Sequence, residues 1–296
     1  MHKYAPTYSS RLYSNHAISR VLPIFALFFL LSFSAPFSLG AESLLASSSS
    51  AKVFQLNTKT DSLLLGSGSV LVGGAYGLQY LLGTTSAPST LPLLDTTDIN
   101  WFDRQLMHSY DKTLDVASDV LLGFSCIIPG AFAFSSQSDL GTVGVMYLES
   151  LLLSYGLKEL GKTLFPRTRP YMYFDGYPTE ALSDGDYQRS LPSGHTTTAF
   201  TSAAFTSYVF NSYYPDSAWK LPVALGVYGV ATTIAILRVT SGNHFATDVL
   251  AGALIGTVSG ILVPWLHKTH AKDSIANNLL SHMIILSDGL FFRFSV

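Results

Sequence analysis

The stretch LPVALGVYGVATTIAILRVTSGNHFATDVLAGALIGTVSGILVPWL, residues 221–266, contains two long apolar segments, 221–237 and 246–266, on either side of a short polar turn. Each segment approaches or reaches the roughly 20 residues that an α-helix needs to cross a bilayer. The turn TSGNH at 240–244 contains glycine and polar residues, which typically mark helix ends. The stretch therefore predicts two consecutive helices that lie in a membrane or beside one.

Four further apolar stretches precede it, and Pro- and Gly-containing loops punctuate the chain between the stretches. They cover residues 64–82, 116–134, 142–161 and 196–214. Two of them are not cleanly apolar, because 142–161 contains Glu149 and Lys158, and 196–214 is rich in Thr and Ser. Polar groups at membrane depth face a bundle interior or a cavity. The predicted fold class is thus all-α, a bundle of about six core helices that is either membrane-embedded with a polar centre or very apolar and soluble beside a membrane.

The composition excludes several classes of protein. Of the 296 residues, 48% are hydrophobic and only 12% are charged, about half the usual charged fraction, which excludes intrinsic disorder. Lys and Arg total 17 against 19 Asp and Glu, with no long basic stripe, so nucleic acid is not an expected partner. The single cysteine, Cys126, excludes an internal disulfide framework and a multi-cysteine metal site.

The chain ends differ from the apolar body. Residues 1–41 begin with basic residues and continue into an uncharged apolar segment, which predicts a signal peptide or an uncleaved N-terminal anchor. We expect a lead-in segment at 42–62, a helical domain at 63–268 and a tail at 269–296. In the tail, Ser287-Asp288-Gly289 between apolar runs indicates a small hairpin. Segment 97–115 mixes charged and apolar residues at helical spacing and predicts an amphipathic, interfacial helix.

Three polar clusters stand at the ends of three apolar stretches. They are Lys162 with Arg169-Pro170 after 142–161, Pro192-Ser193-Gly194-His195 before 196–214, and Arg238, His244 and Asp248 after 221–237. If the stretches are antiparallel helices, these ends meet at one face of the bundle, which predicts a single pocket.

The residue types in that pocket indicate a phosphate ligand. Three cations, Lys162, Arg169 and Arg238, suit a multiply charged anion and repel a metal ion. We expect Ser193 and Gly194 to present unpaired backbone amides at a helix start, where the helix dipole also favours an anion. The pocket is therefore predicted to bind a phosphoryl group.

Two histidines and a carboxylate add the parts for catalysis. His244 and Asp248 are four residues apart and share one helix face. A carboxylate there is expected to accept a hydrogen bond from one ring nitrogen and leave the other free to attack. His195 remains to donate a proton to a leaving oxygen, which completes the set needed for covalent phosphoryl transfer. By contrast, His267 and His270, next to Lys268 and Lys272, are interpreted as a basic flank of the last helix.

The motifs KTLFPRTRP (162–170), PSGH (192–195) and LRVTSGNHFATD (237–248) resemble those of the type 2 phosphatidic acid phosphatase superfamily. That superfamily also contains bacterial non-specific acid phosphatases and vanadium haloperoxidases. The resemblance implies that His244 becomes phosphorylated, that Asp248 orients it and that His195 protonates the leaving alcohol. It assigns phosphate binding to Lys162, Arg169, Ser193, Gly194 and Arg238. Leu237 stands where the family pattern has serine.

The resulting hypothesis is a metal-independent phosphatase, without a cofactor and inhibited by vanadate, that hydrolyses a phosphomonoester or diphosphate ester through a phosphohistidine. The apolar surroundings suggest a lipid phosphate as substrate. The alternatives are a vanadate-dependent haloperoxidase, with vanadate as prosthetic group, and a non-catalytic envelope protein.

We expect the protein to be associated with a membrane of a bacterial-type cell envelope, with the site on the periplasmic side and loop 171–191 over its mouth. The predicted topology contains a conflict, since three spans after residue 42 would place Lys162 inside, whether the first segment is a cleaved signal or an uncleaved anchor. Either one segment does not span as assumed, or the bundle is exported whole and lies in the periplasm. The basic residues 267–272 favour a cytoplasmic C-terminal end.

Overall fold

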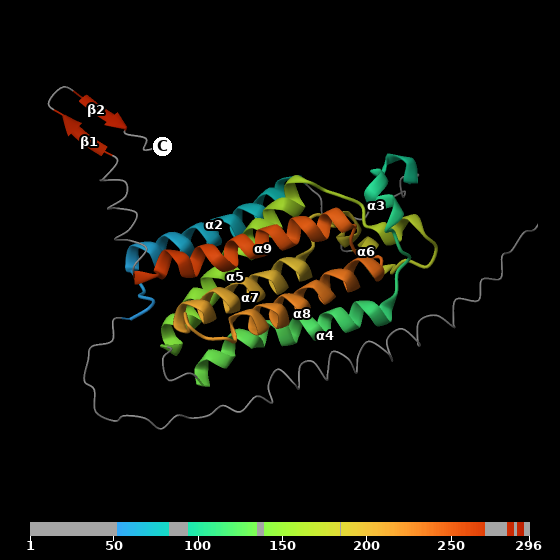
Figure 1. Cartoon of the computed structure of the whole chain (residues 1–296). Coiled ribbons are helices and arrows are strands. Elements are labelled where there is room, and N and C mark those ends of the chain that lie inside the picture. Colours follow the sequence, from blue (N-terminus) through green and yellow to red (C-terminus); the bar gives the residue numbers. More distant parts are fainter. Residues whose placement is uncertain are drawn as a thin grey trace, which may run out of the picture. The chain divides into compact units, whose positions relative to one another are not determined.

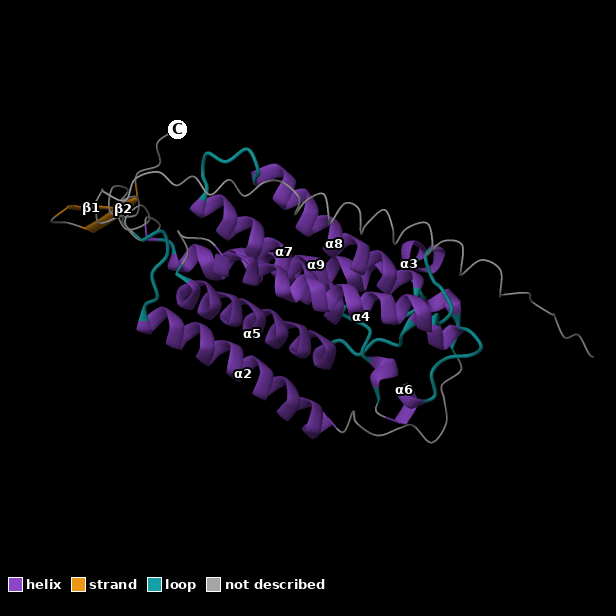
Figure 2. Ribbon diagram, turned by 90° about the horizontal axis from the view of Figure 1, so that it is seen from below, coloured by secondary structure: helices purple, strands orange, loops and turns teal. Residues whose placement is uncertain are grey.

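A computed structural model describes residues 52–82, 94–134, 139–183, 185–269, 283–286 and 289–292; the predicted signal or anchor at 1–41 lies outside them. Six long helices run side by side in this part of the chain (Figures 1 and 2). They are α2 (Thr58–Leu82), α4 (Lys112–Ile127), α5 (Leu140–Leu164), α7 (Gly194–Tyr213), α8 (Lys220–Thr240) and α9 (Ala246–His267). Each coincides with one of the predicted apolar stretches, so the all-α bundle is confirmed.

The helices alternate in direction, which brings several helix ends to one end of the bundle. The end of α5 meets the segment before α7, where a Cβ on Gly161 would lie 2.9 Å from Pro192 Cδ. The start of α9 meets the same segment, because the Ser193 amide donates to the Asp248 carbonyl at 3.0 Å. The end of α8 meets the residue before α4, since the Asp111 amide donates to the Ser241 carbonyl at 3.2 Å. All three predicted polar clusters therefore lie at this end.

Helix α7 is the central helix, and it packs most extensively on α9. Glycines along α9 face it, and a Cβ at Gly252 would lie 2.6 Å from the Ser193 carbonyl oxygen. Small residues permit such close backbone approach between helices. The buried hydroxyls of α7 are satisfied within the helix, because Thr197 and Thr201 each donate to the carbonyl four residues earlier at 2.8 Å. The Thr-rich composition of this stretch thus reflects an interior position.

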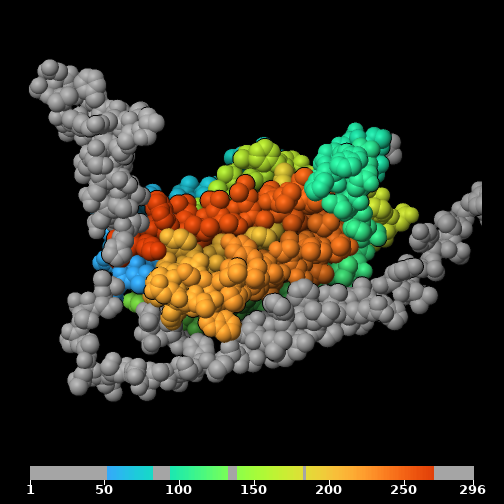
Figure 3. Space-filling model, viewed as in Figure 1, coloured from blue at the N-terminus to red at the C-terminus, as the bar shows by residue number. Residues whose placement is uncertain are grey.

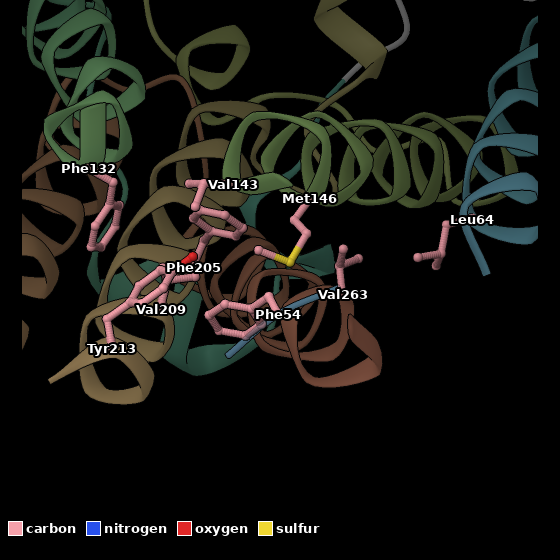
Figure 4. Close-up of a cluster of buried hydrophobic side chains, with 9 residues drawn as sticks. All are labelled: Phe54, Leu64, Phe132, Val143, Met146, Phe205, Val209, Tyr213 and Val263. Carbon is pink, nitrogen blue, oxygen red and sulfur yellow. The ribbon is translucent and has the colours of Figure 1, made fainter. Parts of the chain in front are cut away.

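Apolar side chains fill the half of the bundle opposite the three polar clusters, and they also cover the outer surface of the bundle. Figure 4 shows the largest interior cluster, formed by Phe54, Leu64, Phe132, Val143, Met146, Phe205, Val209, Tyr213 and Val263. On the outer surface, Leu254 is 66% exposed and Leu225 61% exposed, on the helices α9 and α8 that Figure 3 shows at the front of the bundle. A polar centre with an apolar exterior is the arrangement expected of helices in lipid.

Four helical segments in the described residues are long and apolar enough to cross a membrane. They are Lys112–Phe132, Leu140–Leu164, Lys220–Thr240 and Ala246–His267. Helix α7 is not among them, since its polar residues lower its hydropathy. Together with the exposed leucines, these segments identify a membrane-associated protein and favour the membrane-embedded alternative over the soluble one.

Two boundaries predicted from the sequence are wrong. Segment 97–115 is not one helix but η1 (Thr96–Asp98), α3 (Trp101–Gln105), a loop and the start of α4. Its polar residues act as helix caps: the Asn100 side chain accepts from the Asp103 amide, and the Asp111 side chain accepts from two amides of α4. Helix α2 begins at Thr58, inside the predicted lead-in, because Asn57 caps it.

The rest of the described chain consists of short elements. Around the loop after α5 lie η3 (Pro170–Tyr173), α6 (Glu180–Ser183) and η4 (Asp186–Gln188), and η2 (Ile128–Phe134) extends α4. In the tail, β1 (Met283–Leu286) pairs antiparallel with β2 (Gly289–Phe292), with Leu286 opposite Gly289. The predicted hairpin is confirmed, although its turn residues 287–288 lie outside the described part.

Candidate active site

His244 lies in the loop between α8 and α9 and is almost completely buried, with 2% of its surface exposed. Its Nδ1 lies 2.8 Å from the Ser190 carbonyl oxygen. A carbonyl can only accept, so Nδ1 carries the proton and Nε2 carries the lone pair. The Arg169 guanidinium lies 3.2 Å from that Nε2. The ring is thus held with its nucleophilic nitrogen toward a cation.

The surroundings keep the His244 ring neutral. Burial comes first and the positive charges of Arg169, Arg238 and Lys162 follow, and together they hold the pKa of His244 well below its usual range. His195 contributes to the same effect. His195 and all three predicted cations therefore act on the buried His244 ring, as the single-pocket prediction requires.

Asp248 does not hold the His244 ring directly, which corrects the expected hydrogen bond between them. Its Oδ2 lies 3.9 Å from His244 Nδ1. The carboxylate instead accepts from the Ser190 hydroxyl at 2.5 Å, from the Phe245 amide at 2.9 Å and from Arg167 at 2.6 Å. The predicted carboxylate–imidazole contact is replaced by one through Ser190, whose hydroxyl binds Asp248 and whose carbonyl binds the ring.

Arg167 is a site residue that the sequence analysis missed. Its guanidinium bridges two buried carboxylates, Asp248 at 2.6 Å and Asp103 at 2.7 Å, and it stacks on the Phe245 ring at 4.0 Å. Burial alone would raise the pKa of Asp103, but hydrogen bonds from Arg167 and Thr247 outweigh burial and lower it. Arg167 stands inside the motif KTLFPRTRP, so the motif could have indicated it as a site residue. It ties α3 to the start of α9.

The guanidinium of Arg169 is held by the loop after α5. It pairs with the Asp186 carboxylate at 2.7 Å and donates to the Asp186 and Asn243 carbonyls at 2.9 and 3.0 Å. Burial would raise the pKa of Asp186, but the charge of Arg169 outweighs it and lowers the pKa. The loop predicted to cover the pocket mouth thus also positions one of its cations.

Helix α4 holds the second guanidinium. Arg238 is buried, pairs with Asp115 and donates to the Ser118 hydroxyl at 2.9 Å. Its Nε is buried and donates to no described residue, so this donor is available to a bound oxyanion. Leu237 occupies the position where the family pattern has serine. In this chain the serine hydroxyl that contacts Arg238 comes from Ser118 on α4.

The remaining phosphate-binding candidates show one departure. The Ser193 amide is not unpaired as expected, because it donates to the Asp248 carbonyl. The first backbone hydrogen bond of α7 runs from Thr197 to Ser193, and among the described residues no backbone acceptor binds the Gly194 amide. The Lys162 side chain lines a small pocket with Thr163, Pro166, Gly185, Gln188 and Arg189. None of the other predicted phosphate-binding residues lines that pocket, so the anion-binding roles of Gly194 and Lys162 stay predictions.

His195 faces α4 at the same end of the bundle. Its Nε2 lies 2.6 Å from an Asp119 carboxylate oxygen, and its side chain is 26% exposed. The acids of α4, Asp115 and Asp119, were not predicted as site residues, because they stand alone in the sequence without a motif. A proton donor beside a buried nucleophile and a cluster of cations can transfer a phosphoryl group.

Comparison with known proteins identifies the class of this domain. Residues 144–272 match the family model of the PAP2 superfamily, and this range contains all three motifs. This segment of the chain is therefore similar to the PAP2 superfamily, the family that the motifs resemble.

One curated relative and two solved structures resemble the chain. The lipid A 1-phosphatase of Porphyromonas gingivalis is 27% identical over 171 residues, which are 57% of this chain and 34% of that protein. Crystal structures of Aquifex aeolicus LpxE (TM-score 0.39, 24% identity, 54% of this chain and 91% of that one) and of a transmembrane PAP2-type phosphatidylglycerolphosphate phosphatase from Bacillus subtilis (TM-score 0.42, 19% identity, 69% and 94%) are also similar. The matched segment thus spans about a third of the curated relative.

Proposed function

We propose that the protein is a PAP2-type phosphatase that removes a phosphate group from a lipid through a phosphohistidine. One observation carries the proposal: the lone pair of His244 Nε2 lies in a buried, strongly cationic environment, 3.2 Å from Arg169. A neutral imidazole is a nucleophile, and surrounding cations stabilise the charge on a phosphoryl group in the transition state. The match of residues 144–272 to the PAP2 superfamily supports the same reaction class.

The chemistry follows from these groups in two steps. His244 Nε2 attacks the phosphorus while the bond to the lipid oxygen breaks, and His195 gives its proton to that oxygen. Water then attacks the phosphorus, the N–P bond breaks, and inorganic phosphate leaves with His195 as the base. Arg169, Arg238 and Lys162 bind the phosphoryl oxygens in both steps.

A lipid is the proposed substrate because the site lies at the end of helices with an apolar exterior. Leu250, also on α9, is 61% exposed near the site end of that helix. The curated relative acts, by its name, on lipid A. We therefore infer a membrane lipid with an exposed phosphate or diphosphate group as the substrate class.

The test is phosphate release by the full chain purified in detergent. The panel contains a lipid A 1-phosphate, phosphatidate, phosphatidylglycerol phosphate, a polyprenyl diphosphate and a water-soluble aryl phosphate. We expect turnover of at least one lipid, inhibition by orthovanadate and no inhibition by EDTA. His244→Ala is expected to lower kcat/KM by on the order of 10⁴-fold or more, whereas His108→Ala, at an exposed histidine, leaves it unchanged.

Three results contradict the proposal. Full turnover by the His244→Ala variant removes the nucleophile assignment. Absence of phosphate release from every substrate favours a non-catalytic role, and bromide oxidation by vanadate-loaded protein favours the haloperoxidase.

We further infer that the site end faces away from the cytoplasm. Both ends of the bundle's chain lie at the opposite end, since Val53 and Thr269 are paired there at 3.2 Å, and Lys52, Lys59 and Lys268 stand near this end. Basic residues favour the cytoplasmic side. This orientation requires that 1–41 does not deliver residue 42 to the outside, either as a cleaved signal or as an anchor that spans the membrane once. Single cysteines at Lys59 and Lys112, in a Cys126→Ser background, test it: an impermeant maleimide should label only position 112 in intact cells.

A further inference from the structure

Three metal-ligating side chains meet at the end of the bundle opposite the candidate active site. They are Asp61 in the first turn of α2, Glu149 on α5 and His267, the last residue of α9. Their ligand atoms all lie within 4.8 Å of one another. Figure 1 shows the start of α2 beside the end of α9. None of these side chains takes part in the proposed phosphatase site.

The hydrogen bonding of His267 leaves one nitrogen for the carboxylates. Its Nδ1 lies 2.8 Å from the Val263 carbonyl oxygen, which can only accept, so Nδ1 carries a proton. Its Nε2 lies 2.8 Å from Asp61 Oδ1 and 3.4 Å from Glu149 Oε2. A histidine whose other nitrogen donates to a backbone carbonyl is the usual arrangement of a metal ligand.

Glu149 is the feature that points to a missing cation. Its surface is completely buried, and neither carboxylate oxygen accepts a hydrogen bond from any described residue. Leaving a buried carboxylate without hydrogen bonds is costly. Even if His267 is doubly protonated, its single Nε2 proton can bond only one of the two carboxylates well, and that partner is Asp61 at 2.8 Å. The oxygens of Glu149 then remain unsatisfied.

A metal ion satisfies all three side chains together. Ligands of tetrahedral Zn²⁺ at about 2.0–2.2 Å from the ion lie about 3.3 Å from one another. The distances from His267 Nε2 lie on either side of that value, 2.8 Å to Asp61 Oδ1 and 3.4 Å to Glu149 Oε2. One nitrogen and two carboxylate oxygens suit a divalent transition metal rather than Mg²⁺ or Ca²⁺. The C-terminus of α9 also favours a cation.

We propose that Asp61, Glu149 and His267 form a binding site for a divalent transition-metal ion of the Zn²⁺ class. The Asp61 side chain is 20% exposed, which leaves solvent access for the ion and for a water as fourth ligand. The ion joins α2, α5 and α9, and the His267 carbonyl additionally accepts from the Gln55 amide at 2.9 Å. The site is structural, and it is separate from the phosphoryl-transfer chemistry at the other end.

The experiment measures metal content, spectrum and stability on the full chain, purified in detergent without a polyhistidine tag. After chelation and removal of the chelator, the protein is incubated with Zn²⁺ or Co²⁺ and dialysed. We expect a single retained ion per chain, a visible absorption band from bound Co²⁺ and a rise in Tm of roughly 5–10 °C at a hundredfold excess of Zn²⁺ over Kd. Phosphate release, measured in parallel, should not change.

Variants separate this site from incidental binding. Glu149→Gln and His267→Gln are expected to lose the retained ion and the Co²⁺ band, whereas His108→Gln keeps both. Asp61→Asn, at a partly exposed position, serves if the buried variants do not fold, and it should weaken Zn²⁺ binding at least tenfold. A chain without a retained ion or Co²⁺ band, or an Asp61→Asn variant that binds Zn²⁺ as tightly as the unaltered chain, overturns the proposal.

Discussion

Helix α9 carries a buried histidine at each end, and the two ends differ in the charge that surrounds the ring. His244 precedes the first turn and His267 is the last residue. Both rings donate from Nδ1 to a main-chain carbonyl at 2.8 Å, so both direct Nε2 into the bundle. Arg169, Arg238 and Lys162 act on the first Nε2, whereas Asp61 and Glu149 face the second.

The charged neighbours of an imidazole, not the imidazole itself, determine whether it suits an anion or a cation. Cations and the positive end of the helix dipole prepare His244 for an anion. Two carboxylates and the negative end of the same dipole prepare His267 for a cation. The two proposals thus assign opposite chemistries to the two ends of one helix, and removing charge at either end tests them.

The largest expected effect comes from removing a charge at the His244 end. Arg169→Gln takes away the cation nearest Nε2 and should lower kcat/KM by about 10²–10³-fold, as loss of one transition-state donor does. Glu149→Gln, the corresponding change at the His267 end, should leave kcat/KM unchanged and abolish metal retention. Equal loss of activity in both variants would mean that the two ends are not independent.

A smaller effect is expected at Arg167, which positions Asp248 without reaching the phosphoryl group. Arg167→Lys keeps the charge but cannot bridge Asp103 and Asp248 in the same planar geometry. We expect kcat to fall by about 10-fold, with KM nearly constant, because a slight misplacement of the nucleophile affects the chemical step.

Arg104→Lys provides the matched control for Arg167→Lys, since the Arg104 guanidinium donates hydrogen bonds to the carbonyls of Thr97 and Ile99, outside the candidate site. A change in KM alone at Arg167 would place it in substrate binding instead.

The smallest effect is a shift in pH dependence. His244 must be neutral to attack, and burial together with neighbouring cations lowers its pKa. Activity should therefore persist below the pH of about 6.5 at which a free imidazole becomes protonated, and it is lost as pH falls through the lowered pKa. The groups that face the ring are Arg169, Arg238, Lys162, His195, Asp186 and Asp248.

Comparing the Arg169→Gln variant with the unaltered chain removes the contribution of substrate ionisation, which is the same for both proteins. The acid limb of the kcat/KM profile should move to higher pH in Arg169→Gln than in the unaltered chain. An unchanged limb contradicts the assignment of His244 as the group that titrates.

The helices and the motif residues were predictable because each leaves a pattern in consecutive residues. Apolar length located all six long helices, and alternation of helix direction placed Lys162, His195 and His244 at one end. Isolated polar residues leave no such pattern. Asp103, Ser118 and Ser190 act through contacts with residues far away in the chain, and nothing in their local sequence indicates those partners.

The interpretation from sequence was also wrong at His267, because the neighbouring residues indicated a different role. His267 was interpreted as part of a basic flank because lysines follow it, yet its ring points into the bundle toward Asp61 and Glu149. The Thr and Ser residues of α7 indicated an interior position, but only the structure shows that α4, α5, α8 and α9 pack against it. A hydropathy pattern gives the length of a helix but not the neighbours of each of its faces.

The backbone contact between α7 and α9 has a consequence for how the protein tolerates change. Gly252 lies one turn after Asp248 and allows no side chain against the Ser193 carbonyl. The separation between His195, at the start of α7, and His244, just before α9, is therefore set by main-chain atoms. These atoms cannot adapt by changing rotamer as leucine side chains can. A methyl group added at this glycine would spread the helices and impair turnover from a position that never meets the lipid, so an inactive variant found by screening need not mark a substrate-binding residue.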